Sequence, residues 1–313
     1  MILKSITSII ARSKLALSNL VTLAARLGDI HRSSDQININ QGIILTELHR
    51  NKKSKHLQDY EFRVFSQFGE DGILQRLINC IEIKTKTFIE FGVEDFHEAN
   101  CRFLLMKDNW AGFVIDGSAS NIARLKTSYF YWKHDLVAIN AFITRENINS
   151  LLAQSGFDED IGILSIDIDG NDYYVLEAIE NYRPRILILE FNADFGPIRK
   201  ISVPYEPDFV RTKKHYSNLY FGASLAAMTH IAARKGYSLV GTNSNSSNGF
   251  FVRNDLLNSE LEVLSVEQAY SPALFRQSRD QEGNFTFVRA KDRLELMKGL
   301  RIFNVEANTL EWL

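Results

Sequence analysis

Three aspartates follow one apolar run of the sequence at close spacing. The segment ILSIDIDGNDYYVL, residues 163–176, ends its apolar stretch in Asp167 and Asp169, and Asp172 comes three residues later. If the run is a strand, Asp167 and Asp169 point to the same side of it. Two carboxylates that close repel one another unless a cation, a shared proton or several donors compensate. The pattern indicates a cation site or a site of proton transfer.

Acidic residues also end other apolar runs of the chain. They are Glu90, Glu94 and Asp95 in the first run, Asp116 in the second, and Glu190 and Asp194 around the last. In open α/β sheets, ligands bind beyond the carboxyl ends of the strands, where the strand order reverses. We therefore expect these acids to line one binding site, because solvated surface charge does not explain such a row.

Strand and helix patterns alternate from Asp59 onward. Strands are expected at 86–93, 111–117, 136–142 and 185–192, with residues 163–176 supplying another, and helices at 69–80, 99–107, 121–128 and 145–154. This alternation predicts parallel βαβ units in an α/β fold. The runs are almost continuously apolar, as expected for strands covered on both faces.

The alternation of strand and helix patterns ends at residue 192. Residues 193–221 form a long loop with three prolines, and a helix of small residues fits 222–236. YSLVG and GFFVR, separated by TNSNSSN, predict an antiparallel hairpin at the edge of the sheet. We expect a helical N-terminal extension over residues 1–58, a core domain over 59–254, and a helical C-terminal extension over 255–313 that packs on the core.

Composition narrows the classes of protein. The chain has 313 residues, 45% hydrophobic and 24% charged, with a formal net charge of −2. That is globular composition without the basic field that a nucleic-acid partner needs. Cys80 and Cys101 are too few for a disulfide framework, so a reducing, cytoplasmic location is expected. Neither cysteine lies in a CxxC or CxxH pair, which excludes the usual structural zinc motifs.

The first 28 residues contain basic residues and no acid. Apolar residues from Ile2 to Leu27 fall on one helical stripe, and Asp29 is the first acidic residue. Residues 1–28 are therefore expected to form an amphipathic helix that packs on its own domain or on a second subunit of a homo-oligomer. Two alternatives are peripheral contact with an anionic membrane face, such as the inner membrane, and a transit peptide.

Asp116 and Gly92 indicate a nucleoside ligand. An acid at the end of the second strand accepts hydrogen bonds from two ribose hydroxyls, although Asp116 also fits the N-cap of the following helix. Gly92 allows close approach of a ligand to the backbone. The further glycines of a dinucleotide motif are absent, and acids crowd the next helix start. This favours the phosphate-free cation S-adenosylmethionine over NAD or ATP.

Several segments, in order, resemble class I S-adenosylmethionine-dependent methyltransferases. They are FIEFGVEDFHEANCRFLL, GFVIDGS, ILSIDIDGNDYYVLEAI and ILILEFNADFGP, and the most similar group is the FkbM-like proteins of bacterial polysaccharide gene clusters. FSQFGEDGIL, GASLAAMTHIAARKGYSLVG and NGFFVR also resemble that group, over roughly Asp59 to Asn254. The resemblance implies a Rossmann-like, seven-stranded, mostly parallel sheet with a C-terminal antiparallel hairpin. The single glycine of the first motif departs from the family pattern.

The resemblance also implies roles for individual residues. Glu90 and Gly92 would hold the amino-acid end of the cofactor and Asp116 the ribose, while Gln67 and Asp71 close over it and Phe142 flanks the adenine. Related sugar O-methyltransferases place metal-binding acids at the ends of the fourth and fifth strands. Their counterparts here, which would bind one Mg²⁺, are Asp167, Asp169, Glu190 and Asn192.

Without a metal, Asp169 would act as general base and Asp167 would contact the cofactor ammonium. His97 and His215, each in an expected loop, are the other candidate bases. Asp172 also fits the first turn of a helix, where the dipole favours an acid.

The acceptor implied by the resemblance is a sugar hydroxyl of a surface polysaccharide or glycolipid. Residues 193–221 carry tyrosines suited to a sugar ring, Tyr205, Tyr216 and Tyr220, and basic residues suited to an anionic glycan, Arg199, Lys200, Arg211, Lys213 and Lys214. Ordinary solvated charge explains the basic residues equally well. Two other functions stay open: a metal-dependent sugar-modifying enzyme that does not use S-adenosylmethionine, and a non-catalytic scaffold that keeps the fold.

Overall fold

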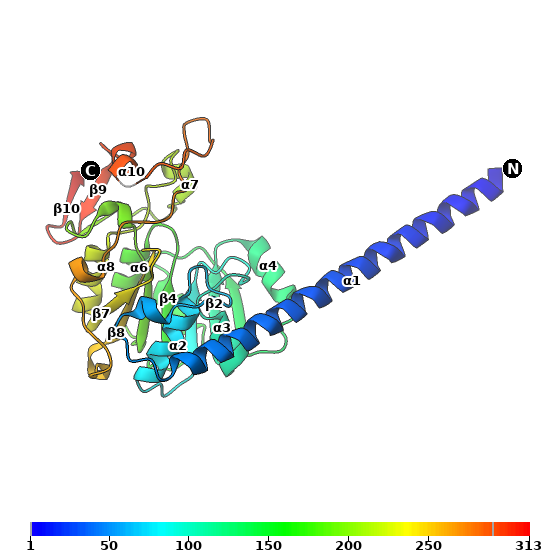
Figure 1. Cartoon of the computed structure of the whole chain (residues 1–313). Coiled ribbons are helices and arrows are strands. Elements are labelled where there is room, and N and C mark those ends of the chain that lie inside the picture. The colour runs from blue at the N-terminus through cyan, green and yellow to red at the C-terminus, as the bar shows by residue number, and fades with distance from the viewer. Residues whose placement is uncertain (1, 290) are drawn as a thin grey trace.

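A seven-stranded sheet forms the centre of the protein (Figure 1). The computed structural model describes residues 2–289 and 291–313. The strand order is β3-β2-β1-β4-β5-β8-β7, with bounds β1 Thr87–Phe91, β2 Ala111–Asp116, β3 Leu136–Asn140, β4 Ile163–Ile166, β5 Ile186–Glu190, β7 Tyr237–Thr242 and β8 Asn248–Arg253. The first five strands are parallel, and β8 pairs antiparallel with both β5 and β7. The predicted fold class, a Rossmann-like sheet with an antiparallel hairpin, is confirmed.

The strand order reverses between β1 and β4. From β1 the chain adds β2 and β3 on one side, then crosses to add β4 and β5 on the other. A ligand crevice forms at such a reversal, beyond the carboxyl ends of the strands. Register places the ends of β1, β2 and β4 side by side, because Glu90 pairs with both Val114 and Ser165. The acids that end these strands therefore meet at one edge of the sheet.

Helices cover both faces of the sheet. On one face lie α2 (Glu70–Cys80), α3 (Arg102–Asp108) and α4 (Ala119–Thr127), and on the other α5 (Ile148–Ala153), α6 (Asp172–Ala178) and α8 (Leu225–Arg234). An apolar cluster lies on each face of the sheet, and successive residues of a strand belong alternately to one cluster and the other. Ile186 and Ile188 belong to one cluster, for example, and Leu187 and Leu189 to the other. This two-sided burial explains why the strands are apolar throughout.

The N-terminal helix is longer than expected. Helix α1 runs from Ile2 to His49, well beyond the amphipathic helix expected over residues 1–28, and the short helix η1 (Leu57–Tyr60) follows. Figure 1 shows the C-terminal part of α1 lying along the body near α2 and α3, while its N-terminal part projects away. Among the residues that the structure describes, none of the helices combines the length and apolarity that crossing a bilayer requires.

One buried ion pair anchors α1 to the body. Asp35 accepts a hydrogen bond of 2.6 Å from Arg102 of α3 and another of 2.6 Å from the hydroxyl of Tyr129. The guanidinium of Arg102, 1% exposed, lies 3.9 Å from the ring of Phe65. At Gly42 the helix passes so close to α3 that a Cβ atom would lie 2.6 Å from the ring of Phe103. The helix is therefore fixed to the body over residues 35–46.

The C-terminal extension is only partly helical, so this expectation was wrong. After η3 (Asn254–Leu256), the described residues of the extension include the short helices α9 (Val266–Ala269) and α10 (Lys291–Leu296) and the hairpin of β9 (Arg301–Asn304) and β10 (Thr309–Trp312). The loop over 193–221 also has structure: η2 (Ala193–Phe195), β6 (Ile201–Ser202) and α7 (Arg211–Lys214). Strand β6 pairs with β9, which forms a second, three-stranded sheet. The extension is a hairpin because the loop offers a strand edge to pair with. The domain boundaries at residues 58 and 254 stay a prediction.

We predict that Asp35→Ala destabilises the protein by about 3–5 kcal/mol, because it leaves the buried guanidinium of Arg102 without its partner carboxylate. Asp29→Ala is the matched control, since its ion pair with Arg32 lies in solvent, with 67% of the Asp29 side chain exposed. Such pairs contribute less than about 1 kcal/mol. Urea unfolding measures both. Equal free energies of unfolding for the two variants would contradict the anchoring role of Asp35.

Candidate active site

A cleft of about 800 Å³ opens at the carboxyl ends of the parallel strands. It brings together most of the residues that the sequence singled out: Gln67, Glu90, Gly92, Asp116, Phe142, Asp167, Asp169, Glu190 and Asn192. Its volume lies in the range of small-molecule sites in proteins. Three predicted site residues, Asp71, His97 and His215, do not line it. The acids expected at the strand ends line this one cleft, except Asp95, which pairs with Arg124 outside it.

Gly92 sits where the end of β1 approaches the end of β4. Its φ is +69°, and a Cβ atom built there would lie 1.6 Å from the backbone oxygen of Asp167. Any side chain would have to push the two strand ends apart. Glycine is therefore required for the close spacing of the first and fourth strand ends, and hence for the shape of the cleft floor.

Glu90 holds the loop that leaves β1. Its two carboxylate oxygens accept hydrogen bonds from the backbone N–H groups of Asn100, at 2.7 Å, and Cys101, at 3.0 Å. Burial raises the pKa of Glu90 to about 7. The loop so fixed carries Glu94 and Glu98 into the cleft. Direct contact between Glu90 and a ligand stays a prediction.

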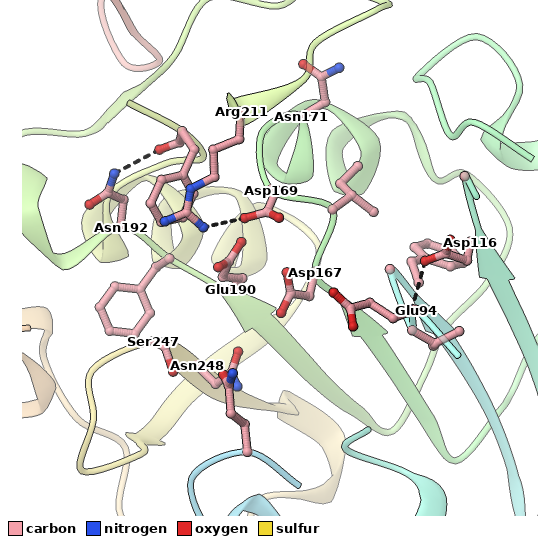
Figure 2. Close-up of a pocket in the computed structure, with 18 of the residues that line it drawn as sticks. Glu94, Asp116, Asp167, Asp169, Asn171, Glu190, Asn192, Arg211, Ser247 and Asn248 are labelled. Atoms are coloured by element: carbon pink, nitrogen blue, oxygen red, sulfur yellow. Dashed lines mark hydrogen bonds and ion pairs between the residues drawn. The ribbon is translucent and has the colours of Figure 1, made fainter. Parts of the chain in front are cut away.

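Asp116 lies at the other end of the cleft from β5 (Figure 2). Its oxygens accept hydrogen bonds from the backbone N–H groups of Glu94, at 2.9 Å, and Ser118, at 2.7 Å. The N-cap of α4 is Ser118, whose hydroxyl accepts from Asn121, so the N-cap alternative for Asp116 was wrong. The side-chain amide of Asn121 donates a third, longer hydrogen bond of 3.3 Å. A carboxylate has about four acceptor positions, so Asp116 keeps capacity for one further hydrogen bond from a ligand. Phe142, 47% exposed, offers a ring face nearby on the cleft wall.

Three carboxyl groups crowd the centre of the cleft. Oxygen atoms of Asp167, Asp169 and Glu190 all lie within 4.8 Å of one another. Figure 2 shows the three side chains together, with Arg211 reaching Asp169 at 2.5 Å. Burial, and then repulsion by neighbouring acids, raises the pKa of Asp167 and of Glu190 well above the ordinary range. Glu190 Oε2 is buried and lacks a hydrogen-bond partner among the described residues.

Asp172 fixes the loop that carries these acids. Its carboxylate accepts hydrogen bonds of 2.9 Å from the backbone N–H groups of Ile168 and Gly170. Between these two, Asp169 takes a left-handed conformation with φ of +57°, which costs a non-glycine residue energy. Asp172 lies in the first turn of α6, as expected, and also orders the turn before it. The position of Asp169 therefore depends on two backbone hydrogen bonds.

Asn192 lines the cleft, but its side chain is engaged elsewhere. Its amide nitrogen donates to the backbone oxygens of Leu219, at 2.8 Å, and Phe221, at 3.0 Å, and its oxygen accepts from the backbone N–H of Asp194. Asn192 therefore fastens the loop over 193–221 to the end of β5. These hydrogen bonds occupy the Asn192 side chain, so the candidate Mg²⁺ ligands are Asp167, Asp169 and Glu190.

The other three candidates have roles outside the cleft. Asp71 is 1% exposed, and one of its oxygens accepts hydrogen bonds from the backbone N–H groups of residues 64–66. His97 is exposed, and its backbone oxygen accepts from Arg102. His215 bonds Ser217 at 2.7 Å and packs against Tyr216. The positions of these three residues in the sequence could not show that they lie outside the cleft.

Sequence reasoning missed two arginines of the cleft. The sequence indicates only the positive charge of Arg211, whereas its guanidinium packs over Phe221 at 3.6 Å and pairs with Asp169. Arg293 comes from the C-terminal extension and forms a buried ion pair of 2.8 Å with Asp194. No local pattern reveals that pair, because its partners are 99 residues apart.

Comparison with known proteins finds similarity to solved structures alone. No family model matches the chain, and neither does any curated protein. The solved structures include M. capricolum TrmK with S-adenosyl-homocysteine, at 11% identity and a TM-score of 0.36, covering 63% of this chain and 74% of that one. A putative O-methyltransferase from Klebsiella pneumoniae has 12% identity and a TM-score of 0.33, covering 68% and 80%. Values this low carry no argument about activity, so the function is argued from the cleft.

We predict that Asp71→Asn changes how stability depends on pH. Burial raises the pKa of Asp71 to about 6, from about 3.9 in an unfolded chain. A raised pKa in the folded state gives stability below about pH 4 that is lost as the pH rises through about 6. The two-unit shift corresponds to about 3 kcal/mol. Between pH 4 and pH 7 the variant should gain about that much relative to wild type in urea unfolding. Parallel pH profiles would contradict this.

Proposed function

We propose that the protein is an S-adenosylmethionine-dependent O-methyltransferase that acts on a sugar hydroxyl. The observation that carries the proposal is the number of carboxyl groups in the cleft at the strand reversal. Eight carboxyl side chains line it, namely Glu90, Glu94, Glu98, Asp116, Asp167, Asp169, Glu190 and Asp194, against the guanidinium groups of Arg211 and Arg293. Both arginines already pair with acids. Such a cleft repels a pyrophosphate and suits a cation.

The geometry at the ends of β1 and β2 fits the cofactor. Asp116 has acceptor capacity for a ribose hydroxyl, the ring of Phe142 is exposed nearby, and Gly92 lets the ends of β1 and β4 lie close together at the floor of the cleft. Glu94 and Glu98 add negative charge that suits an ammonium and a sulfonium. When bound, the cofactor supplies a methyl group on its sulfonium. The role of these residues is to bind and orient it.

The three acids at the centre of the cleft, Asp167, Asp169 and Glu190, lie where they would act on the acceptor hydroxyl. Transfer to a hydroxyl requires in-line placement of the oxygen and removal of its proton. Asp169, on a fixed turn beside Glu190, can take that proton. The same three acids, Asp167, Asp169 and Glu190, fit a hard cation such as Mg²⁺, since they offer oxygen ligands within 4.8 Å of one another. Such an ion would hold two neighbouring hydroxyls and lower the pKa of one.

The walls of the cleft support a neutral glycan as acceptor. Aromatic rings of Phe209, Phe221 and Phe275 line it together with polar side chains of Thr212, Asn218 and Gln277. The expected tyrosines do not line it: Tyr205 bonds Glu146, and Tyr220 bonds the backbone of Arg301.

The basic residues of the loop are largely neutralised. Ion pairs join Arg199 to Glu311, Lys200 to Glu306 and Lys214 to Glu206. This argues against an anionic acceptor. The same proposal includes assignment to the FkbM-like group and a polysaccharide or glycolipid as the acceptor. It also includes a cytoplasmic location, which suits the two free cysteines.

We predict that S-adenosylhomocysteine binds and that Asp116→Asn weakens binding at least about tenfold, because the amide loses charge and one acceptor for the ribose hydroxyls. Asp95→Ala is the control: Asp95 follows the same strand but pairs with Arg124 and does not line the cleft. Isothermal calorimetry measures all three proteins. Absence of binding by the wild type would overturn the proposal and favour a scaffold or an enzyme without this cofactor.

We predict that Mn²⁺, a probe for the Mg²⁺ site, binds the wild type and binds Glu190→Gln at least about tenfold more weakly, since a ligand charge is lost. Glu94→Gln is the control, because it removes a cleft carboxylate outside the group of three. Electron paramagnetic resonance of free Mn²⁺ gives the affinities. If the wild type binds no Mn²⁺ while it binds S-adenosylhomocysteine, the acids act without metal.

A further inference from the structure

Helix α1 leaves a row of large apolar side chains in solvent. Leu20, Leu23, Leu27, Ile30, Ile37, Ile44 and Leu48 each expose between 49% and 68% of their surface. Of residues 14–34, apart from residue 24, whose side chain is not described, all but Gly28 are exposed. A helix surrounded by water on every side has little to hold it, because helices in proteins depend mainly on packing of one face. The row therefore needs a partner.

The spacing of the row is that of a coiled coil. Positions 20, 23, 27, 30, 34, 37, 41, 44 and 48 alternate in steps of three and four, which is a seven-residue repeat. In the sequence the same repeat runs back through positions 16, 13, 9, 6 and 2, and it contains Ala16, Ile9, Ile6 and Ile2. The repeat thus spans almost the whole of α1, about 72 Å for its 48 residues.

A different face of α1 is used by the body. Asp35, Ile39, Gly42 and Thr46 are the buried residues of the helix. With Leu20 and Leu27 at position a and Leu23 and Ile30 at position d, the body-facing residues fall at positions b and f. Those positions lie opposite the a and d seam. Over residues 14–48 the apolar row therefore faces away from the chain's own domain and is exposed.

We propose that α1 joins further copies of this chain in a parallel coiled coil. An identical helix is a suitable partner, because each apolar residue of the row then packs against the same residue of the other helix. The polar a positions, Ser13, Ser34 and Gln41, meet their own equivalents only when the helices are parallel and in register. Leucine at a with isoleucine at d favours three or four strands over two. A row with a 3.5-residue period is a coiled-coil property, whereas a helix lying on lipid presents a broad face with a period of 3.6 residues. Leu15, Leu17, Val21 and Ile43 are exposed outside the row.

The test is the mass of the full chain in solution, by light scattering after size exclusion. The wild type should have three or four times the chain mass of 35.8 kDa. Leu23→Glu with Ile30→Glu, both in the seam, should give 35.8 kDa. Leu15→Glu with Val21→Glu is the matched control: both side chains are more than 60% exposed but lie at positions c and b. It should keep the wild-type mass.

Two results would overturn the proposal. One is a monomeric wild type, for which flotation with anionic phosphatidylglycerol vesicles would show whether lipid covers the row instead. The other is equal loss of assembly in both double variants, which would mean that the seam is not the contact. Unchanged circular dichroism of the body and unchanged S-adenosylhomocysteine binding would show that a monomeric variant is still folded. A dimer rather than a larger assembly would correct the strand number alone.

Discussion

The crowding of Asp167, Asp169 and Glu190 at the strand reversal is the constraint on which the site depends. Oxygen atoms of these three carboxyl groups lie within 4.8 Å of one another, and one guanidinium contacts one of the groups. Their negative charges repel one another, and the fold must offset this repulsion. Buried acids relieve it by holding protons, and a bound cation relieves it more completely. The backbone around them is correspondingly rigid. Asp172 bonds the turn on one side, and Gly92 lets β1 press against Asp167 on the other.

The loop after β5 and the C-terminal extension also contribute residues to the cleft that holds these acids. Asn192 ties the loop to the strand end, and Arg211, from the same loop, balances Asp169. Arg293 reaches back from the extension to pair with Asp194, where both side chains are about 95% buried. Pairing of β6 with β9 fixes these two segments to each other. The second sheet therefore shapes the side of the cleft that we propose for the acceptor, while the parallel strands shape the side that we propose for the cofactor.

The sheet and the acidic centre were predictable from the sequence because both follow from local patterns. Apolar runs mark the strands, and parallel strands bring their carboxyl ends to one edge, so Asp116, Asp167 and Glu190 had to lie along that edge. Side-chain direction was not predictable. Asp71 turns inward to three backbone N–H groups, and His215 turns to Ser217, although both lie in segments near the cleft. The Asp194–Arg293 pair depends on a chain reversal that no local pattern encodes.

The cleft and the N-terminal helix share one short loop, residues 62–68. Phe62, Val64 and Phe65 pack with Ile39 of α1, while Gln67 and Phe68, a few residues on, line the cleft. Asp71 fastens the middle of this loop by its backbone hydrogen bonds to residues 64–66. Because both ends belong to one tied segment, the packing of α1 also fixes where the cleft wall begins. The helix is thus part of the architecture of the site, as well as a surface that faces away from it.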